Sequence, residues 1–197
     1  MPRRLATRAA AALAAVAAAG ALAACGTSSA HGNGYQFTYA TKLDTVIPAA
    51  KRQLAEPVSG QSLTGRGTIG IGSYRGHVVV MNFFASWCPP CRAETPQFVD
   101  AYHALHSKGV TFLGVDTTDL RSQGQAFVSL HHVPYPVIYD QQGQVQLKLG
   151  NIPGKLPFTV LLDQRGRVAA VYLGTVTQKD LQTAIDKLHG ASAGHVG

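Results

Sequence analysis

The sequence predicts an α/β domain that has a central mixed sheet, helices flanking this sheet, and an N-terminal β-hairpin as an extension. Residues 77–84 form an apolar run that is typical of a strand buried on both faces. A helical pattern follows this run, and a further strand, helix and strand come next. Two extended segments joined by a short polar turn then predict an antiparallel hairpin near the C-terminus.

The first expected elements lead up to a cysteine pair. Residues 58–63 and 68–71 are short extended segments separated by glycines, and they predict the N-terminal hairpin. Asn82 is the one polar interruption in the buried strand. The helix that follows has apolar residues at helical spacing and ends at a Lys-Gly pair. Pro96 is expected to kink it.

The later elements alternate in type before the closing hairpin. We expect strands at residues 110–115, 137–139, 158–162 and 168–173, and helices at residues 123–130 and 177–188. Residues 163–166 read Asp-Gln-Arg-Gly and suit the turn of the hairpin, and Thr177 suits the N-cap of the last helix.

The N-terminus predicts export and anchoring. Three arginines within the first eight residues precede an Ala-rich apolar run, residues 9–24, which is typical of a cleaved signal. An uncleaved signal anchor is the alternative. The run ends in Leu-Ala-Ala-Cys, which resembles a bacterial lipobox and implies lipidation of Cys25. We therefore expect a signal peptide (1–24), a tether (25–56), the α/β domain (57–190) and a flexible tail (191–197), with the chain anchored on the outer face of the cell membrane.

The charge distribution and the number of cysteines restrict the classes of function that the chain can have. Without the three signal arginines, 14 basic residues remain against 10 acidic ones, and no basic run with interleaved aromatic residues predicts nucleic-acid binding. Cys25 is assigned to the anchor, which leaves Cys88 and Cys91. A bridge that closes so short a loop stabilises a domain little, so the pair is predicted to be reactive. There is no second C-x-x-C for a zinc site, and neither metal nor cofactor is expected.

The segment Trp87-Cys88-Pro89-Pro90-Cys91 predicts redox chemistry at a helix N-terminus. The positive end of the helix dipole favours a thiolate, so Cys88 is the expected nucleophile, and the deeper Cys91 is expected to resolve the mixed disulfide. The two prolines donate no hydrogen bonds, which predicts a less acidic Cys88 and a weaker oxidant. Trp87 suits either a recognition platform or a packing residue.

Glu94 lies three residues after Cys91 and is expected on the same side of the helix. There its carboxyl group could shuttle the proton of the buried thiol. The alternative from spacing alone is a solvated acid in the first turn of the helix.

Residues 57–188 resemble the thioredoxin-fold lipoprotein reductases of the TlpA and ResA type, through the motif NFFASWCPPCRAETP at residues 82–96. The resemblance implies a thioredoxin-like fold and an active-site role for Glu94. Asn82 stands where thioredoxins carry a buried aspartate. Pro157 matches the cis-proline that faces the cysteine pair and leaves the backbone of Leu156 free to pair with a substrate. Phe158 departs from the small hydroxyl residue that often follows this proline.

We expect a monomeric extracytoplasmic enzyme that reduces disulfides of exported proteins and is recharged by a membrane thiol donor. The resemblance implies apocytochrome c as a client. An oxidase of exported proteins is the alternative within the same chemistry. A copper-binding assembly module is the alternative from another class, although added Cys, Met or His ligands at the needed spacing are missing.

Overall fold

The computed structural model describes residues 35, 37, 40–150, 152 and 155–193, with the side chains of residues 191–193 left out. The strands are β1 (Ser59–Ser62), β2 (Thr68–Gly70), β3 (Val78–Phe84), β4 (Val110–Thr117), β5 (Val137–Asp140), β6 (Phe158–Leu162) and β7 (Val168–Leu173). The α-helices are α1 (Pro89–Leu105), α2 (Arg121–Leu130), α3 (Gln144–Lys148) and α4 (Gln178–Ala193). Short 3-10 helices cover Ala49–Lys51, Ile71–Tyr74 and His106–Lys108. None of the helices in these described ranges is long and apolar enough to cross a bilayer.

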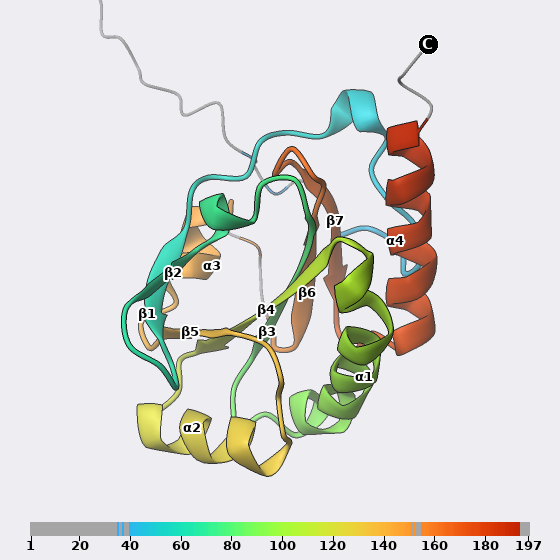
Figure 1. The fold of residues 1–197 in the computed structure, drawn as a ribbon. Coiled ribbons are helices and arrows are strands. Elements are labelled where there is room, and N and C mark those ends of the chain that lie inside the picture. The colour runs from blue at the N-terminus through green and yellow to red at the C-terminus, as the bar shows by residue number, and fades with distance from the viewer. Residues whose placement is uncertain (1–34, 36, 38–39, 151, 153–154, 194–197) are drawn as a thin grey trace, which may run out of the picture. The chain divides into compact units, whose positions relative to one another are not determined.

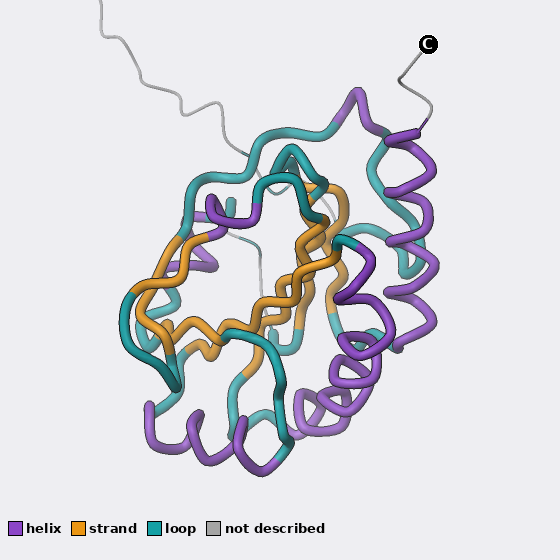
Figure 2. Tube along the Cα trace, viewed as in Figure 1, coloured by secondary structure: helices purple, strands orange, loops and turns teal. Residues whose placement is uncertain are grey.

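The strands form one mixed sheet in the order β2-β1-β5-β4-β3-β6-β7 (Figures 1 and 2). Strands β3, β4 and β5 are parallel, and the hairpins β1–β2 and β6–β7 join them in antiparallel pairing at either side. The carboxyl ends of β3, β4 and β5 therefore meet at the same edge as the start of β6. In α/β sheets this edge is the usual place for a functional site.

The two faces of the sheet are covered differently. Every residue of β3 is buried, because successive side chains enter opposite cores. One face packs against α1, α2 and α4, and Val80 and Phe84 lie there with Phe98 and Phe127. The opposite face packs against α3 and the N-terminal segment (Figure 1). Helices on both faces and an N-terminal hairpin confirm the predicted fold class.

The structure differs from the expected elements in helix boundaries and in one missed helix. Helix α2 begins two residues earlier than expected, and α4 continues to Ala193, beyond its expected end. Helix α3 was not expected, because five residues are too short to show an apolar period. Asp140 holds its start by accepting hydrogen bonds from the backbone of Gln144 (2.8 Å) and Val145 (3.0 Å).

The segment expected to be a tether packs against the domain: Tyr35 lies in the apolar core, and hydrogen bonds to the sheet begin at Thr41. The backbone N–H groups of Thr41 and Ile47 donate to carbonyls of β7 (2.7 Å each), and Val168 of β7 donates to Gln53 (2.8 Å). This part of the chain thus covers the free edge of β7. Such irregular edge pairing requires no repeating apolar pattern, which explains why the sequence gives no periodic signal for it.

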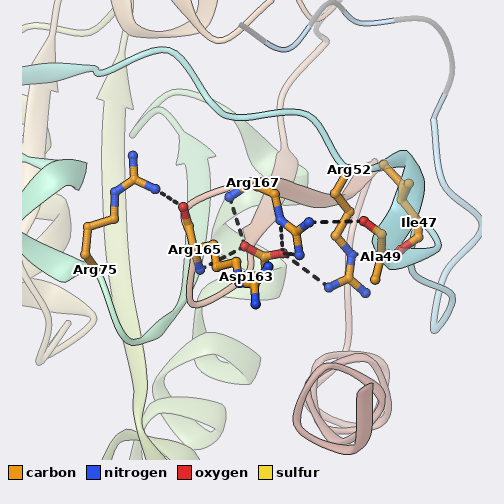
Figure 3. Close-up of polar contacts among 7 residues, drawn as sticks. All are labelled: Ile47, Ala49, Arg52, Arg75, Asp163, Arg165 and Arg167. Atoms are coloured by element: carbon orange, nitrogen blue, oxygen red, sulfur yellow. Dashed lines mark hydrogen bonds and ion pairs between the residues drawn. The ribbon is translucent and has the colours of Figure 1, made fainter. Parts of the chain in front are cut away.

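A buried carboxylate joins this segment to the β6–β7 turn (Figure 3). Asp163 accepts hydrogen bonds from Arg52 (3.3 Å) and from Arg167 (2.8 Å). Burial alone would raise the pKa of Asp163, but these bonds outweigh burial and lower it below its usual range. Arg75 also donates to the carbonyl of Arg165 in the same turn. The group lies at the end of the sheet opposite to the cysteine pair.

Candidate active site

Cys88 and Cys91 form a disulfide at the start of α1. Cys88 is the N-cap residue, and its sulfur accepts a hydrogen bond from the backbone N–H of Cys91 at 3.3 Å. Pro89 and Pro90 occupy the first two helical positions, where a missing N–H costs the helix little. The N–H of Cys91 is therefore the first donor that this helix end offers to the Cys88 sulfur.

Both cysteines are enclosed. Cys91 is fully buried and Cys88 is 2 % exposed in this oxidised state. They belong to an apolar cluster with Phe84 and Phe127, and Leu156 packs against the same cluster.

Glu94 is buried on α1, with only 3 % of its surface exposed. Its Oε1 accepts a hydrogen bond from the Asn82 side chain (2.8 Å), and its Oε2 accepts one from the backbone N–H of Val176 (3.2 Å). Burial raises the pKa of Glu94 from 4.5 to about 7, although both hydrogen bonds oppose this. The surroundings exclude the solvated first-turn acid and give a carboxyl group that exchanges a proton near neutral pH.

Trp87 lies on the surface beside the cysteines. Trp87 is 57 % exposed, and its Nε1 donates to the Thr118 carbonyl at 3.1 Å. A groove of about 340 Å³ adjoins it, and the residues that line this groove are Trp87, Thr117, Thr118, Gln146, Lys155 and Leu156. The peptide bond between Leu156 and Pro157 is cis, as the resemblance implies. The structure thus brings Trp87 and Leu156 together at one groove, next to the disulfide.

Two acids, one near the end of β4 and one in the loop before α2, were missed by sequence reasoning. Asp116 is fully buried in β4, and Asp119 is 3 % exposed in the loop that follows. Asp119 Oδ2 accepts a hydrogen bond from the backbone N–H of Ser86 at 2.6 Å, in the turn that leads to Cys88. The only sequence signal is an acid at each end of a Thr-Thr pair after an apolar strand, which also suits an exposed turn.

Two further expectations concern metal and lipid. Across the described ranges, no group of three or more His, Cys, Asp or Glu side chains is arranged to hold a metal ion. Cys25, the predicted lipidation site, lies outside the described residues.

Comparison with known proteins agrees with this geometry. The family model described as Redoxin matches residues 45–187. The thiol-disulfide oxidoreductase ResA of Geobacillus kaustophilus is 31 % identical over 118 residues, which are 60 % of this chain and 67 % of that protein. The sporulation thiol-disulfide oxidoreductase A of Bacillus subtilis is 27 % identical over 55 % of this chain and 66 % of that protein. The matches thus span about two thirds of these relatives.

Solved structures show the same fold over nearly their whole length. A secreted thiol-disulfide isomerase from Corynebacterium glutamicum superposes with a TM-score of 0.73 and 32 % identity, covering 79 % of this chain and 98 % of that one. A DsbF homologue from Corynebacterium diphtheriae gives a TM-score of 0.72 and 30 % identity, covering 78 % and 99 %. These similarities indicate an extracytoplasmic location. The chain belongs to the Redoxin family, and within it to the TlpA/ResA-like thiol-disulfide oxidoreductases of thioredoxin fold.

Proposed function

We propose that this enzyme reduces disulfides of exported proteins, with Cys88 as the nucleophile, Cys91 as the resolving thiol and Glu94 as the proton carrier. The observation that carries the proposal is the buried carboxyl of Glu94, which has a pKa of about 7. Glu94 lies on the same helix as the fully buried Cys91. A buried thiol needs a nearby base before it can attack, and a base is most effective when its pKa is close to the working pH.

The reaction begins with the reduced pair. The Cys88 thiolate attacks one sulfur of the client disulfide, and the other client sulfur leaves as a thiolate that takes up a proton. Cys91 then gives its proton to Glu94 and attacks Cys88, which releases the second client thiol and leaves the enzyme disulfide. Two electrons have passed to the client. A membrane dithiol donor returns them to the enzyme by the same exchange.

The hydrogen bonds of Glu94 support this role. Asn82 and Val176 donate one bond to each carboxyl oxygen, so the carboxylate form is stabilised even though it is buried. Without these donors, burial would hold Glu94 protonated at neutral pH, and it could not accept the Cys91 proton. Asn82 therefore acts as a positioning residue in place of the aspartate of thioredoxins.

The groove beside Trp87 supports binding of an extended client segment. The exposed ring of Trp87 offers an apolar surface, and Lys155 is the charged side chain among the residues that line the groove. The Leu156 backbone beside cis Pro157 would pair with the client backbone. Apocytochrome c remains the client that the resemblance implies.

The signal-like N-terminal sequence supports a position on the outer face of the membrane. A signal peptide ending at residue 24 and lipidation of Cys25 would hold the enzyme on the membrane surface, near its thiol donor. The packing of Tyr35 in the core and the contacts of residues 41–54 with β7 leave the segment before Tyr35 for the proposed tether.

An isomerase or oxidase is the second candidate. The C. glutamicum structure at 32 % identity is described as an isomerase. The two directions differ in the reduction potential of the cysteine pair, which a glutathione titration measures. A value near roughly −270 mV, as in thioredoxin, agrees with a reductase, whereas one near roughly −120 mV, as in a strong oxidant, would exclude it.

Trapping identifies the clients. A Cys91→Ala variant should accumulate mixed disulfides through Cys88 when it is expressed in the exported form, because the resolving step is lost. A Cys88→Ser variant is the matched control and should trap none. If the two variants capture the same proteins in the same amounts, Cys88 is not the attacking thiol.

A further inference from the structure

A carboxyl group lies completely buried beneath the active-site turn and has no part in the proposed reaction. Asp116 is 0 % exposed, and no N–H or hydroxyl group of the described residues donates to either of its carboxyl oxygens. It stands opposite Phe84, the last residue of β3, in the parallel β3–β4 pairing. A Cβ atom at Gly124 of α2 would lie 2.0 Å from Asp116 Oδ2, so the absence of a side chain there makes room for this carboxyl.

The charges around Asp116 disfavour its ionisation. Burial raises its pKa most, the negative charge of Asp119 and a hydrogen bond between the two carboxyl groups add to this, and the positive charge of Arg121 only partly opposes them, so the pKa is about 8. The Arg121 guanidinium donates instead to the carbonyls of Ser62 (2.9 Å) and Leu63 (3.1 Å). Its carbon also lies 4.2 Å from the centre of the Tyr139 ring.

The remaining neighbours carry no charge that could offset the carboxyl. Tyr139 of β5 faces Asp116 in the β4–β5 register, and its hydroxyl donates to the Asp119 carbonyl at 3.3 Å. Cys88 and Cys91, in the same apolar cluster as Phe84, are joined in the disulfide and do not titrate. Ionised Asp116 would therefore stand next to the negative charge of Asp119, and Arg121 would offset this only in part.

Asp119 and Thr118 hold the turn that presents the cysteines. Asp119 accepts hydrogen bonds from the backbone N–H of Ser86 (2.6 Å) and of Leu120 (2.7 Å). The Thr118 carbonyl accepts the bond from the Trp87 ring at 3.1 Å. Thr118 has a φ of 54°, in a region that β-branched residues rarely adopt. Two bonds from a strained loop thus fix Ser86 and Trp87, the residues directly before Cys88.

We propose that Asp116 is a positioning residue of the active-site turn: while it is uncharged, Asp119 keeps its place and holds Ser86 and Trp87, and its ionisation displaces Asp119 and loosens the turn. The step moves one proton from the Asp116 carboxyl to solvent and changes no covalent bond. Its consequence for catalysis rests on the role proposed for Cys88. The displacement itself can be measured in the disulfide form, where that role has no influence.

Trp87 is the only tryptophan in the chain and lies in the turn, so its fluorescence reports the position of this segment. In the disulfide form of the full mature chain, we expect the Trp87 emission to change with pH with a midpoint near 8. An Asp116→Asn variant should lack this transition, because an amide at this position does not ionise. Far-UV circular dichroism over the same pH range checks that each protein stays folded.

Two further variants separate Asp116 from other groups. Asp119→Asn removes the neighbouring negative charge, so the midpoint should fall by about one pH unit. Glu94→Gln should keep the transition near pH 8, although Glu94 also titrates near neutral pH. The proposal is overturned if wild type shows no transition, if Asp116→Asn retains it, or if Glu94→Gln abolishes it. Should Asp116→Asn fail to fold, an unchanged midpoint in Asp119→Asn would overturn the proposal on its own.

Discussion

Replacement of Glu94 by glutamine should remove a pH-dependent part of the stability of the disulfide form. Burial raises the pKa of Glu94 from 4.5 to about 7 in the folded protein. Between these two pH values the folded protein holds the proton and the unfolded chain has lost it. The free energy of unfolding therefore falls as the pH rises through this interval, and it levels off above about pH 7.

The size of the effect follows from the same values. The difference between 4.5 and about 7, at about 1.4 kcal/mol per pH unit, gives about 3 kcal/mol. Glutamine does not titrate, and its amide group can accept only one of the two bonds donated by Asn82 and Val176. The variant should therefore be about 1 kcal/mol less stable than wild type at low pH. As the pH rises, the free energy of unfolding should fall in wild type but not in the variant, so the difference between them should shrink and then reverse.

Urea unfolding of the disulfide form, followed by circular dichroism between about pH 5 and about pH 8.5, measures this difference. The disulfide form is used because its cysteines do not titrate. Asp100→Asn changes an exposed carboxyl on the same helix and serves as the control, which should run parallel to wild type. A stability difference between Glu94→Gln and wild type that stays constant over the whole range would refute the reasoning.

Three further substitutions test packing, charge and recognition. Gly124→Ala should destabilise the protein by about 1 to 3 kcal/mol in urea unfolding, because its methyl group would lie 2.0 Å from Asp116 Oδ2. Asp163→Asn should cost about 3 kcal/mol at neutral pH, because buried Arg52 and partly exposed Arg167 would lose their carboxylate partner. Since the pKa of Asp163 is lowered, this difference should shrink when unfolding is measured below about pH 4. Trp87→Ala should change stability by less than about 1 kcal/mol, because the residue is 57 % exposed, but it should slow mixed-disulfide formation with a peptide disulfide. Equal trapping rates with and without the ring would contradict a recognition role.

The elements that the sequence predicts well are those with a strong local pattern. The apolar run of β3 and the Asp-Gln-Arg-Gly turn between β6 and β7 are found where they were expected. Helix α3 and the contacts of residues 41–54 with β7 lack such a pattern. They depend on the Asp140 cap and on the free edge of a strand more than a hundred residues away, and no local period encodes either of them.

In the candidate active site, too, some features follow from local sequence spacing and others depend on distant segments. Cys88, Cys91 and Glu94 share one helix end, so their spacing along the chain already predicts that they lie near one another. The partners of Glu94 depend on tertiary structure, because Asn82 comes from β3 and Val176 from the segment before α4. Helical spacing therefore predicts the position of the carboxyl group, whereas its pKa follows from burial between separate elements.

Asp116 is the clearest example of a feature that the sequence alone does not predict. Along β4, Phe112, Gly114 and Asp116 alternate with residues of the other face, so Asp116 points into the helix-covered core rather than to solvent. A carboxyl group fits there because Gly124 contributes no side chain, and a Cβ at that position would meet the Asp116 carboxyl. A single sequence shows only an ordinary aspartate and an ordinary glycine at these positions. Their combined effect is an acid that stays protonated at neutral pH, directly below a turn whose next residues react.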